Sequence, residues 1–126
     1  MSYPTDRKYT KEHEWITADG TIGITHHAQD SLGDIVFVDL PKVGAAITAG
    51  QTFGTVESVK AVSDLFAPAT GTITAVNGEL ATAPEKVNKD AHAAWMLKIK
   101  LADPKQLDGL LSAADYEKFV SEEAGH

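Results

Sequence analysis

The residues of greatest chemical interest lie between Gly54 and Phe66, where Lys60 stands at the middle of a run rich in β-branched side chains. Such side chains favour extended structure, and the glycine before the run and the Pro-Ala-Thr-Gly sequence after it are typical of strand ends. The run therefore predicts two short strands joined by a tight turn that presents the Lys60 amine. A two-residue turn normally contains asparagine or glycine, which tolerate positive φ, and Lys60-Ala61 departs from that preference. A departure from turn chemistry beside a lysine indicates a functional site.

The predicted hairpin has its turn centred on Lys60-Ala61. This register sets Val56 opposite Leu65, which are well suited to pack across a strand pair. It also sets Glu57 opposite Asp64, a like-charge pair that should cost stability. Two other interpretations remain open on this evidence: the valines also fit the spacing of an amphipathic helix, and Lys60 could be an ordinary solvated lysine.

Other chemistry is less well supported by the residues. Ser58 and Lys60 are spaced like a serine-lysine dyad, but no nucleophile elbow or oxyanion-hole motif accompanies them, so a hydrolase is not expected. Of the 5 histidines, His26 and His27 are adjacent. They would point to opposite faces of a strand or lie about 100° apart on a helix, which does not suit one ion. With no cysteine and no His-x₃-His pair, we expect no metal site.

The composition limits the possible functions further. A chain of 126 residues is long enough for one domain with its own core, and the absence of cysteine means that any sulfur redox chemistry must come from a cofactor. The net charge of −7 argues against binding to a nucleic-acid backbone. No apolar run approaches a membrane span, and the first residues resemble neither a signal peptide nor an organellar presequence. We therefore expect a cytoplasmic bacterial protein that does not bind membranes, although a processed mitochondrial form would look the same.

Several segments of this sequence resemble the H proteins of the glycine cleavage system. The resemblance runs in one order along nearly the whole chain and is carried by Tyr9–Trp15, Gly23–Asp30, Leu32–Pro41, Val56–Asp64 and Trp95–Lys100. The run around Lys60 is similar to the lipoyl-lysine segment of that family. One segment departs from the family pattern: Ala91–Ala94 stands where a Pro-Tyr pair and a glycine usually precede the tryptophan, so this turn and any partner contact there could differ.

The resemblance implies a specific role for Lys60, which would carry lipoate as an amide. Lipoyl-Lys60 would accept the aminomethyl group from glycine decarboxylase, a pyridoxal-phosphate enzyme, and pass it to a tetrahydrofolate-dependent aminomethyltransferase. Dihydrolipoyl dehydrogenase would then reoxidise the dithiol, and lipoate-attaching enzymes would be further partners. On this view the chain is a non-catalytic carrier and a monomer.

The resemblance also assigns roles to four other residues. Glu14 and Asp64 would hold the ammonium of the loaded arm in a surface cleft, whereas Glu57 and Gly44 would be recognised by the lipoylating enzyme. The acids could equally be ordinary solvated side chains, and Gly44 could be a turn glycine. Two alternatives to the glycine cleavage role also remain. The chain could act mainly as a lipoyl donor to other enzymes, or as a lipoyl or biotinyl carrier domain of another complex, although such domains typically show Asp-Lys-Ala or Met-Lys-Met around the lysine.

The elements that must position these residues are mostly short strands. Many strands with frequent turns predict a mainly β sandwich or barrel with short peripheral helices and a C-terminal helix, and the resemblance implies the barrel-sandwich hybrid of lipoyl and biotinyl carriers. We expect strands at 9–16, 21–25, 34–40, 45–48, 72–76 and 95–101. We expect helices at 26–32, 104–111 and after Ser112, and a broken helical segment at 79–89. Thr25 should cap the first of these helices, and Gly33 should end it in a left-handed conformation. The 34–40 strand is the most apolar and should be buried, while residues 1–8 and 122–126 should be loose.

Overall fold

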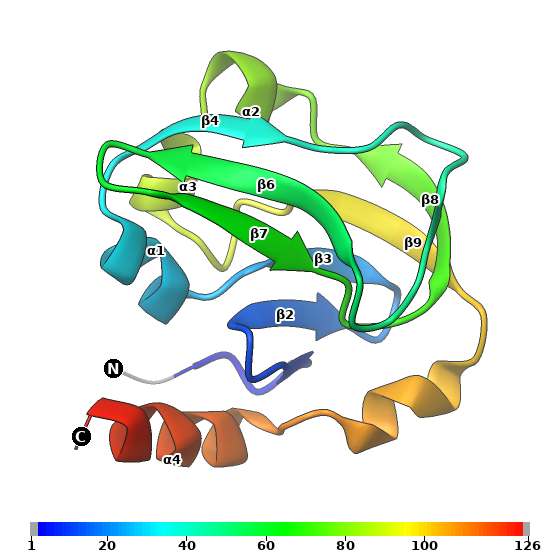
Figure 1. Cartoon of the computed structure of the whole chain (residues 1–126). Coiled ribbons are helices and arrows are strands. Elements are labelled where there is room, and N and C mark those ends of the chain that lie inside the picture. Colours follow the sequence, from blue (N-terminus) through cyan, green and yellow to red (C-terminus); the bar gives the residue numbers. More distant parts are fainter. Residues whose placement is uncertain (1–2, 125–126) are drawn as a thin grey trace.

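Two antiparallel sheets face each other in the computed structural model, which describes residues 3–124 (Figure 1). The larger sheet contains, in spatial order, β1 (Arg7–Tyr9), β2 (Glu14–Thr17), β3 (Thr21–Ile24), β9 (Leu97–Leu101), β8 (Gly71–Val76) and β5 (Ala46–Ile47). The smaller sheet contains β4 (Ile35–Asp39), β6 (Thr52–Ser58) and β7 (Val62–Phe66). This arrangement confirms the mainly β prediction.

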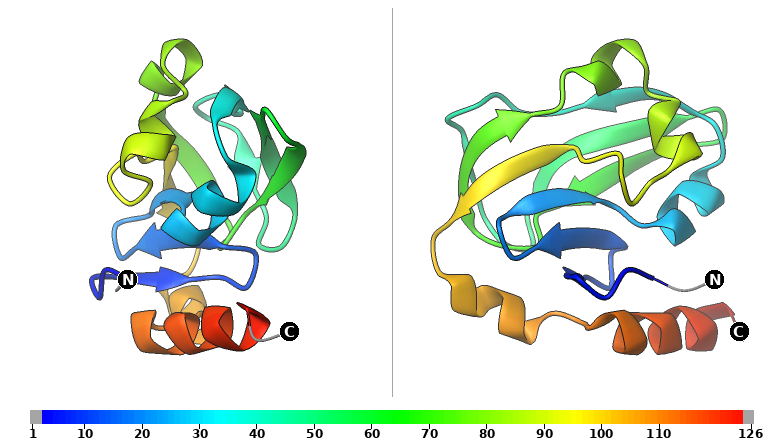
Figure 2. Two further views of the ribbon diagram at one scale, coloured as in Figure 1. Left: turned by 90° about the vertical axis from the view of Figure 1, so that its left-hand side faces the viewer. Right: turned by 180° about the vertical axis from the view of Figure 1, so that it is seen from behind.

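Short helices surround the two sheets (Figure 2). They are α1 (His26–Leu32), α2 (Glu79–Thr82), α3 (Lys86–Lys89), the 3₁₀ helix η1 (Pro104–Gly109) and α4 (Ala113–Ala124). The broken helical segment predicted at 79–89 is thus confirmed as α2 and α3. Within the described residues, no helix combines the length and apolar character that crossing a membrane requires.

The space between the sheets is filled by apolar side chains from both. One cluster is centred on Ile16, Ile22, Ile73 and Ile99, and a second gathers Val56, Leu65, Leu80 and Met96. Val56 and Leu65 come from the two strands that flank Lys60, and both are at most 2% exposed. Their burial anchors the Lys60 hairpin to the core, because removing such side chains from water is the main stabilising term in folding.

The helix α1 begins and ends at the predicted residues. The Thr25 hydroxyl accepts a hydrogen bond from the Ala28 N–H, which satisfies one free donor of the first turn. Gly33 ends the helix with φ 79° and ψ −150°. This is not the left-handed helical geometry that we expected at Gly33, but an extended positive-φ conformation that is essentially restricted to glycine.

Two strand predictions are wrong in detail. The expected 9–16 strand is divided into β1 and β2, because Thr10 closes a turn by accepting the Glu14 N–H through its hydroxyl. The 34–40 strand is not buried on both faces: Val36 and Phe37 are each 50% exposed. The reason is that β4 forms an edge of the smaller sheet and has one face toward solvent.

The chain ends are more ordered than predicted. Residues 7 and 8 belong to β1, and α4 continues through residues 122–124; residues 1–2 and 125–126 lie outside the described part. Tyr116 of α4 stacks on Tyr9 of β1 with ring centroids 4.8 Å apart, and Tyr3 meets both rings edge-on. This aromatic packing holds α4 along β1, where it runs at the bottom of Figure 1.

Candidate functional site

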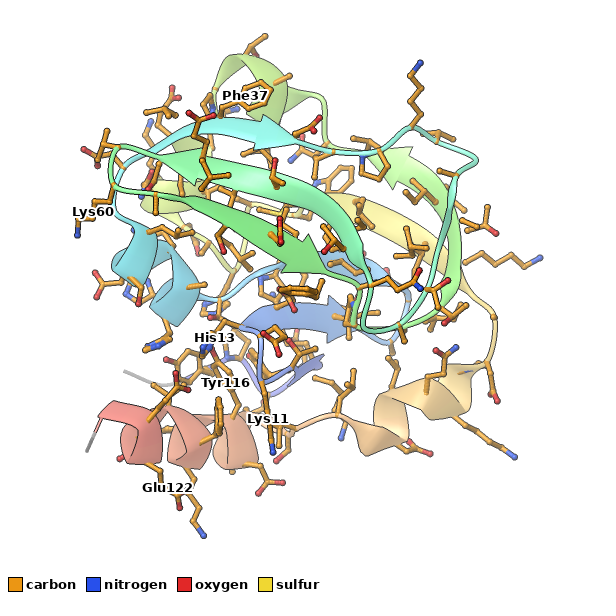
Figure 3. The ribbon with its side chains drawn as sticks, viewed as in Figure 1. Lys11, His13, Phe37, Lys60, Tyr116 and Glu122 are labelled. Atoms are coloured by element: carbon orange, nitrogen blue, oxygen red, sulfur yellow. The ribbon has the colours of Figure 1, made fainter. Side chains whose placement is uncertain are left out.

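The Lys60 turn forms the tip of the β6–β7 hairpin, above α1 in Figure 3. The Ser58 N–H donates to the Ala61 carbonyl at 2.8 Å, so the turn contains four residues, Ser58 to Ala61. The Ser58 hydroxyl accepts hydrogen bonds from the N–H groups of Lys60 (3.2 Å) and Ala61 (3.1 Å). A serine side chain thus organises a turn that lacks asparagine and glycine.

The predicted hairpin is confirmed, which excludes the helix, but its register is wrong by two residues. Glu57 pairs with Val62, and Asp64 pairs with Thr55. The predicted turn was centred on Lys60-Ala61, whereas the Ser58 hydrogen bonds close a turn over Ser58–Ala61 that is centred on Val59-Lys60. The like-charge pair between Glu57 and Asp64 is therefore not formed.

The turn rests on the segment that joins α1 to β4. The Val59 N–H donates to the Asp34 carbonyl at 3.0 Å. The Lys60 side chain lies over Gly33, where an added Cβ would be 3.3 Å from Lys60 Cε. Asn88 of α3 supports the same segment, since its amide donates to the Gly33 carbonyl and accepts the Ile35 N–H, both at 2.8 Å.

Lys60 is exposed at this tip, and among residues 3–124 it forms no salt bridge. In Figure 3 its side chain points away from the end of the hairpin. Val59 and Val62 beside it are 67% and 66% exposed. An accessible amine, a fixed base and apolar neighbours are what an enzyme would need to find and modify this lysine.

The outer face of the smaller sheet is partly acidic and partly apolar near the turn. Glu57 is exposed and lies between its cross-strand neighbours, Phe37 on β4 and Val62 on β7. Glu57 therefore shares a surface with Lys60. Gly44 does not, because it follows the end of β4 that is farthest from the turn, with its N–H bonded to the Ile73 carbonyl. Its φ of 93° is accounted for by a turn.

Glu14 lies in a cleft at the other end of β7. The cleft has a volume of about 460 Å³ and is lined by Thr10, Glu12, Glu14, Ala49, Gly50, Phe66, Ala67, Pro68 and Leu110. Glu14 is only 2% exposed, and its carboxyl accepts a hydrogen bond from the Thr10 hydroxyl (2.8 Å) and another from the Phe66 N–H (3.3 Å). Burial raises the pKa of Glu14 to about 8, and the hydrogen bonds from Thr10 and Phe66 offset part of that effect.

Asp64 lies between the turn and this cleft. It is exposed, and it points to the same face of β7 as Phe66, because alternate residues of a strand share a face. The Phe66 N–H bonds Glu14, so the two predicted acids occur along one path that begins at Lys60. The interpretation of Glu14 as an ordinary solvated acid is wrong, because Glu14 is buried. Asp64 is exposed, so that interpretation does fit Asp64.

The segment that departs from the family pattern is built into the fold. Ala91 is 1% exposed, and its carbonyl accepts the indole N–H of Trp15 at 3.2 Å. The His92 carbonyl accepts a hydrogen bond from Arg7 at 2.8 Å. This turn therefore packs against Arg7 of β1 and Trp15 of β2.

Three residues that position Lys60 were not identified from the sequence. Ser58 had a detectable signal, since serine hydroxyls often accept hydrogen bonds from N–H groups two or three residues ahead. Gly33 was predicted only as the end of a helix. Asn88 gave no signal at all, because its role depends on a contact 55 residues away in the chain.

The comparisons with known proteins agree with one another and together cover the entire chain. Residues 7–123 match the family model described as glycine cleavage H-protein. The chain is 76% identical to the glycine cleavage system H protein of Koribacter versatilis, with both chains covered completely, and 62% identical to that of Acidobacterium capsulatum, again over both complete chains.

A solved structure extends the agreement to the fold. The crystal structure of a glycine cleavage system H protein from Mycobacterium marinum superposes with a TM-score of 0.83 at 39% identity, covering 97% of this chain and 99% of the other. The barrel-sandwich hybrid expected for the fold is thereby confirmed. The chain therefore belongs to the H proteins of the glycine cleavage system, the lipoyl carrier subunits of that system.

Proposed function

We propose that Lys60 is the residue to which lipoate is attached. The observation that carries this proposal is the exposed Lys60 amine on a turn fixed by Ser58 and Asp34. When bound, a lipoyl group supplies a strained disulfide that can accept the aminomethyl unit left by decarboxylation of glycine, pass it to the aminomethyltransferase and be reoxidised by dihydrolipoyl dehydrogenase. The chain itself contains no cysteine, so it provides attachment and positioning.

Glu14 and Asp64 are proposed to hold the cationic amine of the loaded arm. Six residue steps separate Lys60 from Phe66, which is at most roughly 20 Å at about 3.3 Å per step. About a dozen bonds join Cα of a lipoyl-lysine to its sulfur, which is roughly 15 Å when extended. The loaded arm, extended by the aminomethyl group on its sulfur, would therefore run past Asp64 toward the Glu14 cleft, and a cation beside the buried Glu14 carboxyl would favour its ionised form.

Glu57 and Gly44 are proposed as residues recognised during lipoylation. Glu57 is supported by its exposed position beside the turn. Gly44 lies at the opposite end of β4, so its recognition would require an enzyme that extends along the sheet. The further partners that we propose are glycine decarboxylase, the aminomethyltransferase and dihydrolipoyl dehydrogenase. We also propose a cytoplasmic location, which the bacterial origin of the named relatives supports.

The test is an intact-mass measurement of the chain after incubation with lipoate and a lipoate-attaching enzyme. We expect one lipoyl adduct, mapped by peptide analysis to Lys60, and no adduct on Lys60→Arg. Lys42→Arg, an exposed lysine between β4 and β5, is the matched control and should be modified normally. Glu57→Ala should slow the modification. An adduct on Lys60→Arg would contradict the proposal.

A role mainly as a lipoyl donor to other enzymes makes a different prediction. In a reconstituted mixture with the decarboxylase, the lipoylated chain should support exchange of labelled bicarbonate into glycine if it serves glycine cleavage. A chain that transfers its lipoyl group to other acceptors but gives no exchange would favour the donor role.

A further inference from the structure

Three side chains with metal-binding atoms meet where the β1–β2 turn, α1 and α4 come together. They are His13, His27 and Glu123, and within residues 3–124 one ligand atom from each lies within 4.8 Å of the others. The histidine spacing that excluded a metal site concerned neighbours in the chain, whereas this cluster brings together three distant segments. Figure 3 shows His13 and Tyr116 between α1 and α4.

The ring of His13 is held in place by a buried partner. Its Nδ1 lies 2.7 Å from the hydroxyl of Tyr116, which is 0% exposed and is also 2.8 Å from the Thr25 hydroxyl. When the Nδ1–H of His13 donates its hydrogen bond to the Tyr116 hydroxyl, Nε2 keeps its lone pair. Nε2 lies 3.7 Å from the Glu123 carboxylate. Oriented histidines of this kind, bonded through the nitrogen that does not bind the ion, are typical of metal ligands.

The backbone at His13 is also unusual. His13 has φ 72°, the only positive φ of a non-glycine residue within the described range. Hydrogen bonds fix this conformation: the His13 N–H donates to Thr10, and its carbonyl accepts the Thr25 N–H. The conformation brings the His13 ring to 4.7 Å from that of His27, centroid to centroid.

The charge of the chain also favours a cation at this cluster. His13 and His27 are half-buried, and Glu123 is exposed beside them. The net charge of −7 adds a general attraction for cations.

We propose that His13, His27 and Glu123 form a binding site for a divalent transition-metal ion, with Zn²⁺ as the probe. Two imidazoles and one carboxylate are a donor set that zinc accepts with a fourth position for water. Tetrahedral coordination with bonds of about 2.0–2.1 Å would bring the ligand atoms to roughly 3.3 Å apart, a movement that the exposed Glu123 side chain can make. Imidazole ligands disfavour Mg²⁺ and Ca²⁺.

The test is calorimetric titration of the unlipoylated, tag-free chain with Zn²⁺, since lipoyl sulfur would compete for the ion. We expect one ion per chain, loss of binding by roughly tenfold or more in both His27→Gln and Glu123→Gln, and a Tm that rises with Zn²⁺ in the wild type but not in these two variants. Mg²⁺ should not bind there.

Two neighbouring residues serve as controls. Glu122 lies on the same helix as Glu123, and in Figure 3 its side chain points away from the His13 side of α4. Glu122→Gln and His26→Gln should therefore bind Zn²⁺ like the wild type. The absence of Zn²⁺ binding by the wild type, or wild-type affinity in either His27→Gln or Glu123→Gln, would overturn the proposal. Circular dichroism without metal checks that each variant is folded.

Discussion

At the scale of single residues, Ser58 explains how a turn without asparagine or glycine can hold Lys60. Its hydroxyl accepts two backbone N–H groups and donates to the Ala61 carbonyl at 3.2 Å. These bonds fix the two peptide units that determine where the Lys60 side chain leaves the chain. The predicted register failed because it was chosen from well-matched side-chain pairs across the strands, and such pairs do not report the hydrogen bonds of the Ser58 hydroxyl.

Ser58→Ala should loosen this turn while leaving the strands paired. The two N–H groups can turn to water at the exposed tip, so we expect a loss of about 1 kcal/mol in the free energy of unfolding. Hydrogen exchange at the Lys60 and Ala61 amides should become faster. Ser63→Ala, which removes a hydroxyl from the adjacent strand β7, is the control. Equal exchange in the two variants would show that Ser58 does not organise the turn.

At the scale of elements, Lys60 depends on α1, β4 and α3 as well as on its own hairpin. Most of these elements could be predicted, because α1 has a clear cap at Thr25 and the strands have clear boundaries. The contacts between these elements could not be predicted from the sequence. The Asn88 bridge to Gly33 and Ile35 joins segments distant in the chain, and nothing in a local pattern reports it.

Asn88→Ala should destabilise the Gly33–Ile35 segment on which the Lys60 turn rests. It removes two hydrogen bonds of 2.8 Å and leaves two partly buried backbone groups without partners, which costs about 1–3 kcal/mol. Denaturant unfolding measures the loss, and NMR relaxation should show greater mobility at Lys60. Lys89→Ala is an exposed control on the same helix. If it destabilises the chain as much as Asn88→Ala does, the effect belongs to α3 and not to the bridge.

At the scale of the whole molecule, the two-sheet architecture and the Lys60 hairpin could be predicted, but the depth of individual side chains could not. Glu14 illustrates the limit. The alternation of polar and apolar residues around it fits an exposed acid, and only the packing of β2 against the end of β7 buries it. The burial of this carboxyl should influence the stability of the entire fold.

Glu14 should make the folded chain less stable as the pH rises. Its pKa is about 8 in the folded chain and 4.5 when unperturbed, so between these values the folded chain binds more protons than the unfolded one. The free energy of unfolding should therefore fall by roughly 3–5 kcal/mol from below pH 5 to above pH 8, and Glu14→Gln should remove this fall.

Urea unfolding at several pH values tests this expectation. Burial lowers the pKa values of His13 and His92, which makes stability rise with pH in the acidic range, but both proteins share that contribution and it cancels in the difference. Parallel stability curves for the wild type and Glu14→Gln would contradict a raised pKa of Glu14.

The support of Lys60 by residues outside its hairpin has a practical consequence for protein engineering. A graft of residues 54–66 onto a foreign sheet would transfer Lys60 without the contacts that support it. The Asp34 carbonyl, which accepts the Val59 N–H, and Gly33, over which the Lys60 side chain lies, belong to another part of the chain. The smallest portable unit must therefore also include residues 25–35 and 86–89, which contact the turn or hold the segment beneath Lys60 in place.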